Sequence, residues 1–176
     1  MKQALVIVVT VFAAFVVGGI PASAVDTAVV TGGGTGTFGA DIDGDGRMDG
    51  SQFGFGVVLS SSGAARGHFE CLMAGRSQIL GLPVMSVEGR VTGGTMNADG
   101  TVTLSGTATV NLGNGQIFRS VPFEVVITAG GPGTGGLKLT VVGTFDGVPG
   151  DAVAGNGNYD LPQESVASGH ITIATS

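Results

Sequence analysis

Apolar and polar residues alternate with a period of two along several stretches of the chain, and this pattern constrains the fold more than any other feature. In Thr101–Leu112, Val102 and Leu104 begin an apolar set that falls on one face, while threonines and a serine occupy the other. The same alternation runs through Val121–Thr128 and Leu137–Phe145. A period of two predicts β-strands with one buried face.

The alternation also predicts which side chains are buried. Phe53, Phe55, Val57 and Leu59 share one face of a further strand, and Ile171 with Ile173 begins the last one. In Leu137–Phe145 the apolar phase extends to Phe145. Because a strand turns successive side chains to opposite faces, we expect the core to include Val102, Leu104, Val110, Phe123, Val125, Ile127, Leu139 and Val141.

Glycine occupies 34 of the 176 positions, and much of it lies between the predicted strands. Four turn sequences stand out because glycine and asparagine tolerate positive φ: Ser60–Gly63, Asn97–Gly100, Gly130–Gly133 and Asn156–Asn158. Glycines inside strands, such as Gly54, Gly56 and Gly106, indicate bends or close approaches of the backbone. No helical stripe of useful length follows residue 24. The sequence therefore predicts an all-β fold, a single antiparallel sandwich or barrel of about 8–10 strands.

Residues 1–24 are typical of a signal peptide. Lys2 precedes an uninterrupted apolar run, Ala4–Val17, and Pro21–Ala24 ends in small residues at the spacing that signal peptidase cleaves. We expect this helical segment to be removed after Ala24, which leaves one β domain over residues 25–176. The protein would then be secreted or extracytoplasmic, without membrane insertion; an uncleaved N-terminal anchor is the alternative.

The charge and cysteine content of the chain limit the kinds of partner and of covalent link that we expect. The net charge is −6 and only 11% of residues are charged, without the clusters of Lys and Arg that bind nucleic acid or anionic membranes. Cys71 is the only cysteine, so no internal disulfide forms. We expect Cys71 to be a small buried apolar side chain, with an intermolecular disulfide as the alternative.

An acidic stretch, residues 41–49, is the most specific motif. Its spacing D-x-D-x-D-G-x-x-D places carboxylates and one carbonyl where they can converge on a single Ca²⁺. The predicted ligands are Asp41, Asp43, Asp45, the carbonyl of Arg47, and Asp49. Gly46, at the sixth position, allows the sharp turn that such a loop requires. The alternative interpretation is a solvated acidic turn without a metal.

The stretch resembles the calcium loops of EF-hands and dockerins, and especially the DxDGDGxxD loops of FG-GAP-type β-propeller repeats, which lie between β-strands. The resemblance covers about ten residues and implies a metal site rather than a fold. The chain departs from the EF-hand at the twelfth position, where Gln52 stands in place of a bidentate glutamate. One missing carboxylate predicts weak binding, with a dissociation constant on the order of 10⁻⁴–10⁻³ M.

Two weaker groups of polar residues follow. Asp146, Asp151, Asn156, Asn158 and Asp160 lie close together in sequence between glycines. They fit a second hard-cation site or a polar binding surface, or else Asx-turns in a long ordered loop.

The second group is two histidines and one acid, His68, His170 and Glu70. If their strands were neighbours, these side chains would form a small metal or acid–base cluster. Ordinary surface positions are the default interpretation.

Over its whole length the chain is similar to short exported bacterial proteins built around one uncharacterised Gly/Thr/Val-rich β domain. Arg66–Cys71, Thr140–Gly143 and Gly155–Asp160 carry this likeness, which implies an exported β domain and no particular activity.

The sequence is compatible with three functions. The first is a non-enzymatic secreted or cell-surface domain, stabilised by calcium, in surface or matrix interaction with an unknown extracellular partner. The second is a lipocalin-like barrel that carries a small apolar ligand. The third is a polysaccharide-active enzyme with carboxylates from distant strands, which the absence of Trp and the single Tyr159 disfavour.

Overall fold

The computed structural model describes residues 27–39, 41, 46–73, 85–148 and 150–176. This part of the chain contains nine β-strands and no helix. The strands are β1 (Thr27–Thr37), β2 (Gln52–Ser60), β3 (Ala64–Leu72), β4 (Ser86–Met96), β5 (Val102–Asn111), β6 (Ile117–Thr128), β7 (Gly136–Val141), β8 (Tyr159–Asp160) and β9 (Glu164–Thr175). The predicted all-β class is confirmed, and the predicted signal peptide lies outside the described residues.

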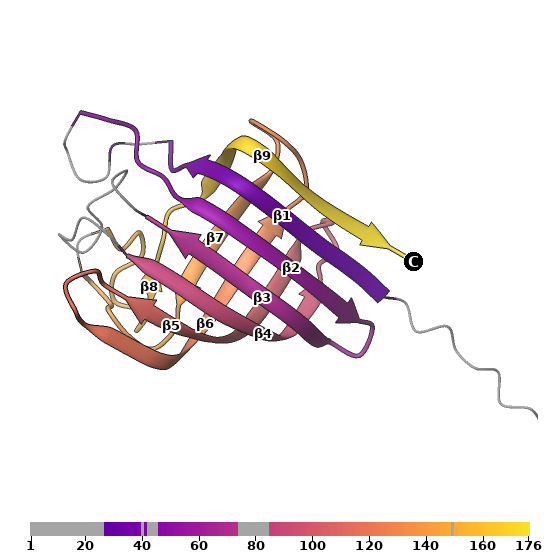
Figure 1. The fold of residues 1–176 in the computed structure, drawn as a ribbon, viewed down its shortest axis with the longest axis horizontal. Helices are drawn as coiled ribbons and strands as arrows, with labels where there is room; N and C mark the ends of the chain where they lie inside the picture. The colour runs from indigo at the N-terminus through magenta and orange to yellow at the C-terminus, as the bar shows by residue number, and fades with distance from the viewer. Residues whose placement is uncertain (1–26, 40, 42–45, 74–84, 149) are drawn as a thin grey trace, which may run out of the picture.

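The strands form one closed antiparallel barrel (Figure 1). Each of β1 to β7 pairs with the next strand in sequence, and β9 closes the ring between β7 and β1. β8 is a short ninth strand that pairs only with β7. Of the two expected architectures, sandwich and barrel, the chain adopts the barrel; closure leaves no long unpaired edge.

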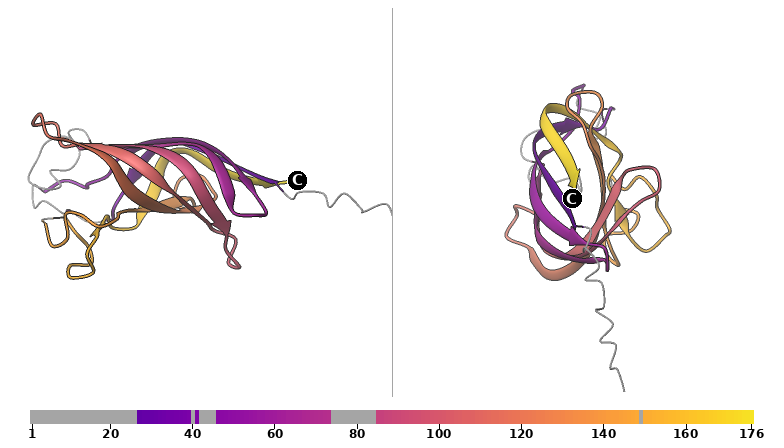
Figure 2. Two further views of the ribbon diagram at one scale, coloured as in Figure 1. Left: turned by 90° about the horizontal axis from the view of Figure 1, so that it is seen from below. Right: turned by 90° about the vertical axis from the view of Figure 1, so that its right-hand side faces the viewer.

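The barrel has two different ends. The end called here the mouth holds the start of β1, the β2–β3 turn, the β4–β5 hairpin and the end of β9. The opposite end, called the loop end, holds the β1–β2 connection, the β5–β6 hairpin and the chain from β7 to β9. Figure 2 shows the barrel from the side and along its length, with the C-terminus at the mouth.

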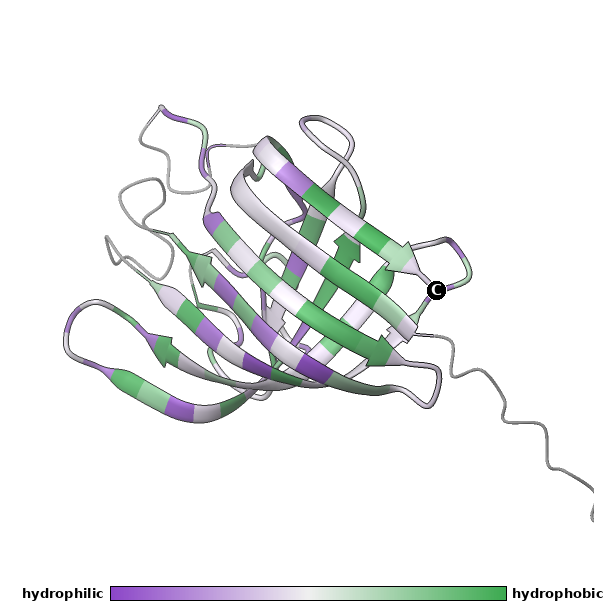
Figure 3. Cartoon of the chain, turned by 45° about the vertical axis from the view of Figure 1, so that its right-hand side comes forward, coloured by the Kyte–Doolittle hydropathy of each residue, from purple (hydrophilic) through white to green (hydrophobic). Residues whose placement is uncertain are grey.

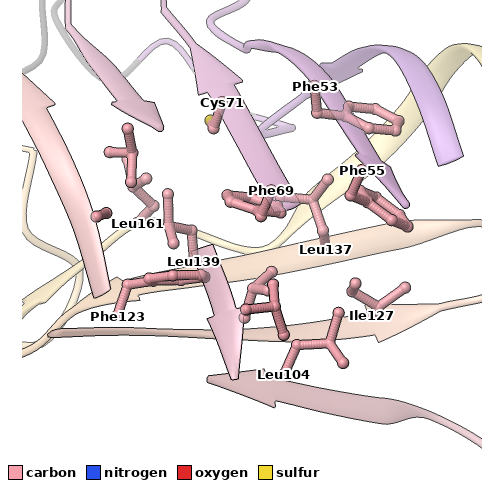
Figure 4. Packing of buried hydrophobic residues seen from close by; sticks show 14 of the residues in the cluster. Phe53, Phe55, Phe69, Cys71, Leu104, Phe123, Ile127, Leu137, Leu139 and Leu161 are labelled. Atoms are coloured by element: carbon pink, nitrogen blue, oxygen red, sulfur yellow. The ribbon is translucent and has the colours of Figure 1, made fainter. Parts of the chain in front are cut away.

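Side chains fill the interior of the barrel. Phe53, Phe55, Phe69 and Phe123 are stacked in a row, with successive ring centroids 6.1, 6.1 and 5.6 Å apart. Figure 4 shows these rings pointing into the same space as Leu104, Ile127, Leu137 and Leu139. The phenylalanines of this row therefore serve as core rather than as the lining of a central channel.

The predicted core is confirmed. Each of the eight residues expected inside is at most 2% exposed, and Figure 3 shows the alternation of hydrophobic and hydrophilic residues along the strands. The four predicted turns all lie between strands or in the loop before β8. Gly63, Gly100, Gly133 and Gly157 each adopt positive φ there.

Two strand boundaries differ from the prediction. β7 ends at Val141, and Phe145 lies in the turn that follows with a φ of 62°; Gly143, with a φ of 74°, breaks the strand two residues before it. β9 begins at Glu164 rather than near Ile171. A register shift against β1 between Thr35 and Gly36 interrupts the alternation there, because a bulge shifts the phase of a strand.

Glycines within strands serve two purposes. A methyl group at Gly106 would collide with the carbonyl of Arg90, so this glycine marks the predicted close approach of two backbones. Gly54 and Gly56 differ from the prediction, because a methyl group at either would meet no atom within 4 Å. They face outward, so β2 has no side chain at these two positions of its outer face.

Candidate functional site

The acidic stretch belongs to the connection between β1 and β2 at the loop end. Within it, the backbone N–H of Gly46 donates a hydrogen bond of 2.8 Å to Oδ2 of Asp41. Gly46 has a φ of 85°, a backbone conformation that favours glycine. The contact folds the first and sixth positions of the motif toward each other. Asp43 and Asp45 lie outside the described residues.

The last two predicted ligands lie where the connection rejoins the barrel. Arg47 is exposed, whereas Asp49 is 1% exposed and its carbonyl accepts a hydrogen bond of 2.9 Å from the N–H of Phe38. Among the described residues, no three His, Cys, Asp or Glu side chains converge in a way that could hold a metal. The calcium site therefore stays a prediction.

The second polar group forms an ordered loop through its own hydrogen bonds. The carboxylate of Asp146 accepts from the N–H groups of Gly155 and Gly157, at 2.6 and 2.9 Å. Asp160 accepts from the Thr140 hydroxyl and from the amide of Asn156, both at 2.7 Å. These acids hold the backbone of the loop, as the Asx-turn alternative predicts.

Asp151 is the centre of this loop. Its carboxylate accepts hydrogen bonds from the N–H groups of Gly147, Val153 and Asp160. Burial opposes ionisation of Asp151, but these hydrogen bonds outweigh it and lower its pKa. Burial and the nearby Asp151 carboxylate together raise the pKa of Tyr159 above its ordinary value. The loop thus combines an ionised acid with a neutral tyrosine as a structural unit.

The two histidines and Glu70 do not form a cluster. His170 on β9 is paired with Gly33 on β1, Gly33 with Gly54 on β2, and Gly54 with Glu70 on β3. Three strand spacings of about 4.8 Å each separate His170 from Glu70. His68 lies on β3 and also faces outward. The default interpretation, ordinary surface histidines, fits this arrangement.

A buried polar group inside the loop end was not predicted from the sequence. Glu164, 1% exposed, accepts hydrogen bonds from the backbone N–H and the hydroxyl of Ser51, at 2.6 and 2.8 Å. Cys71 lies beside them and is 1% exposed. The only signal in the sequence was the even spacing from Glu164 to Val166, which places both on one face of a strand.

The environment of Cys71 makes its thiol unreactive. Burial, together with the Glu164 carboxylate, raises the pKa of the thiol to about 12, although the Ser51 hydroxyl acts in the opposite direction. Nucleophilic attack requires the thiolate. The predicted burial of Cys71 is confirmed, although the thiol lies beside the polar Ser51 and Glu164, and it has no access to a partner in the folded chain.

The mouth contains a cavity of about 440 Å³. It lies between the start of β1, the end of β2, the β2–β3 turn, the end of β4 and the end of β9. Its apolar lining consists of Ala28, Leu59 and Met96, with Gly63 and Gly94; the remaining lining residues carry hydroxyl groups, namely Thr27, Ser60, Ser61, Ser62, Thr95 and Thr175.

The floor of this cavity is part of the core. Ala28 and Leu59 are 4% and 2% exposed, whereas Met96 at the rim is 39% exposed. Gly94 fits on this side because a methyl group there would collide with the Thr103 carbonyl and the Leu104 side chain. The sequence identified Ser60–Gly63 as a turn but contained no signal that this turn borders a cavity.

Comparisons with known proteins identify no relative. Scans against protein-family models, curated proteins and solved structures each found no match. In the part of the chain that the structure describes, no helix has the length and apolar character needed to cross a membrane.

Proposed function

We propose that this chain is a non-catalytic binding domain that takes up a small, largely apolar ligand at the mouth of its barrel. The observation that carries this proposal is the cavity of about 440 Å³, with an apolar floor and a hydroxyl-bearing rim. Small-molecule sites are typically concave and mostly apolar, with a few polar groups, and barrel mouths are a frequent location for them. This proposal modifies the second of the three sequence-based functions: side chains fill the interior in which a lipocalin-like barrel would carry its ligand, so we propose the mouth as the binding site instead.

The size of the cavity sets the scale of the ligand. At roughly 30 Å³ for a water-sized group, the space accommodates about 12–15 non-hydrogen atoms. The cavity is open to solvent, so a slightly larger molecule would bind with part of its surface exposed. Ligands of that size gain about 0.3–0.6 kcal/mol per atom, which corresponds to a dissociation constant between about 1 mM and 1 μM. The proposal is therefore a carrier or sensor of moderate affinity.

The site chemistry supports binding rather than catalysis. The carboxylates of Asp146, Asp151 and Asp160 are engaged as acceptors for the loop that contains them. The histidines lie apart on the outer wall, and the Cys71 thiol is buried and protonated. A catalytic site would need such groups in mutual contact and accessible to substrate.

A fluorescent apolar probe tests the proposal. The chain contains no Trp, so the emission of bound N-phenylnaphthylamine is free of interference from tryptophan. We expect saturable enhancement with the parent chain and weaker binding to Met96→Ala, which removes an apolar contact at the rim. Met48→Ala is the matched control, since Met48 is 54% exposed and lies in the β1–β2 connection at the loop end. Non-saturable enhancement, or equal effects of both variants, would refute the proposal.

We also propose that the domain is exported and that its acidic loop binds calcium. The D-x-D-x-D-G-x-x-D spacing supports the calcium site, as does the hydrogen bond from Gly46 to Asp41.

The apolar run Ala4–Val17 supports export. N-terminal sequencing of the expressed full chain tests export: we expect a mature chain that begins at Val25, and a retained Met1 in the exported fraction would contradict cleavage.

A further inference from the structure

The described residues around the mouth cavity carry no charge. Among the described residues that line it, none is Lys, Arg, His, Asp or Glu. An ionised headgroup placed there would lose water without gaining a charged partner, which is unfavourable. A headgroup that only donates or accepts neutral hydrogen bonds would meet no such penalty.

Hydroxyl groups at the rim can form hydrogen bonds with an uncharged oxygen atom of a ligand. Ser61 and Thr175 are exposed, Thr175 faces inward beside its strand partner Ala28, and neither hydroxyl makes a hydrogen bond within the described part of the chain. A hydroxyl can both donate and accept a hydrogen bond, so these two groups can serve an alcohol, an ester or an ether. Ser60 and Ser62, by contrast, are hydrogen-bonded to each other at 2.8 Å.

The charges near the mouth also disfavour an anion. Asp99 lies in the β4–β5 hairpin that begins after Met96. Hydrogen bonds from the Thr101 hydroxyl and N–H lower the pKa of Asp99, so it is ionised at neutral pH. The cation closest in sequence to the β2–β3 turn is Arg66, which is exposed and is paired with Val58, itself 49% exposed on the outer wall.

We infer that the ligand of the mouth is an uncharged amphiphile, a molecule with an apolar body and a neutral oxygen-bearing head, rather than a fatty-acid anion or an amine. This inference rests on the proposed function and specifies its ligand class. It follows from the uncharged lining, the two available hydroxyls and the size of the cavity.

Two ligands of equal chain length, decanol and decanoate, test the inference by displacement of bound N-phenylnaphthylamine at about pH 8, where the acid is ionised. We expect decanol to bind at least about tenfold more tightly than decanoate. The difference should persist in about 1 M salt, where the Debye length is about 3 Å, because it arises from the missing partner and not from long-range repulsion.

A hydroxyl deletion provides the second test. Thr175→Val retains the shape of the side chain and removes its hydroxyl, and we expect it to weaken decanol binding about threefold to tenfold. Thr31→Val is the matched control, since Thr31 is an exposed threonine on β1 outside the cavity lining. Equal effects of the two variants on decanol binding would overturn the role given to the rim.

The outcomes separate this inference from the proposed function. If the probe binds but decanoate competes as well as decanol, and Arg66→Gln abolishes that competition, the mouth binds anions and only the inference is wrong. If the probe does not bind, both are wrong. If it binds only after removal of the residues before Thr27, or only at dilutions where a dimer dissociates, that segment or a second copy occupies the mouth, and the inference fails.

Discussion

The carboxylate of Glu164 lies inside the barrel and accepts hydrogen bonds from both donor groups of Ser51, its N–H at 2.6 Å and its hydroxyl at 2.8 Å. The two residues are 113 positions apart in sequence and connect the start of β9 with the start of β2. Gly36 on β1, between these strands, makes room for the pair, because a methyl group there would collide with the carboxylate. The contact therefore spans the point where the barrel closes.

Removal of the Ser51 hydroxyl should destabilise the fold measurably. Ser51→Ala deprives a buried carboxylate of one of its donors, and hydrogen bonds to charged groups contribute about 1.5–3 kcal/mol. We expect the free energy of unfolding in urea to fall by that amount. Ser62→Ala, at an exposed serine of the β2–β3 turn, is the control and should change it by less than about 0.5 kcal/mol. Equal stability of the two variants would mean that the buried contact contributes nothing.

Truncation of the stacked row of rings should be costly. Phe123 is 2% exposed and contacts Phe69 at a centroid distance of 5.6 Å. Phe123→Ala should lower the free energy of unfolding by about 3–5 kcal/mol, since the emptied site leaves a cavity. Phe118→Ala is the matched control, because Phe118 is 38% exposed and should cost far less. A parent-like melting temperature for Phe123→Ala would contradict the assignment of this face to the core.

Two strand glycines should respond in opposite ways to the same substitution. A methyl group at Gly89 would collide with the ring of Phe123, whereas one at Gly54 would meet open space. We expect Gly89→Ala to cost about 1–3 kcal/mol through overpacking. Gly54→Ala should be neutral or stabilise by up to about 1 kcal/mol, because it restricts the unfolded chain. Thermal unfolding of both variants would show whether the inner and outer faces of the barrel are assigned correctly.

The alternation of residue types predicted the strands and the core because a half-buried strand points alternate side chains into the core and into solvent, and the residue type follows that alternation. It could not predict closure, which depends on pairing between β1 and β9 at opposite ends of the sequence. The bulge near Gly36 shifts the phase of β9, so Glu164 and Val166 did not stand out as inward residues. The mouth cavity could not be predicted either, because five segments that are separate in the sequence border it.

The thiol of Cys71 should make stability fall at alkaline pH. Its pKa is about 12 in the folded chain and near 9.0 when unfolded. Between these values the folded state retains a proton that the unfolded state has lost, so stability present below pH 9 declines as pH rises toward 12. From pH 8 to pH 10 we expect a loss of about 1.4 kcal/mol that is absent in Cys71→Ala.

The slope of the unfolding free energy against pH, compared between the parent and Cys71→Ala, separates thiol ionisation from the packing lost in the variant. Cys71→Ala will lower stability at every pH, but the difference between the two chains should shrink as pH rises. The raised pKa of Tyr159 adds a further alkaline loss to both chains, mainly above pH 10, so the window from pH 8 to pH 10 isolates the thiol. Parallel curves for the parent and Cys71→Ala across this window would show that the thiol does not resist ionisation.

Calcium should stabilise the folded chain if the acidic loop binds it. A ligand that binds only the folded state raises stability by RT ln(1 + [Ca²⁺]/Kd). At millimolar calcium and a Kd of about 10⁻⁴ M, the gain is about 1.4 kcal/mol, which should raise the melting temperature by about 3–5 °C relative to EDTA. The double variant Asp43→Ala with Asp45→Ala should show no such difference. Magnesium should substitute poorly, because it requires a tighter octahedral shell and retains its water. Identical melting temperatures for the parent in calcium and in EDTA, with no heat of binding by calorimetry, would leave the stretch as a solvated acidic turn.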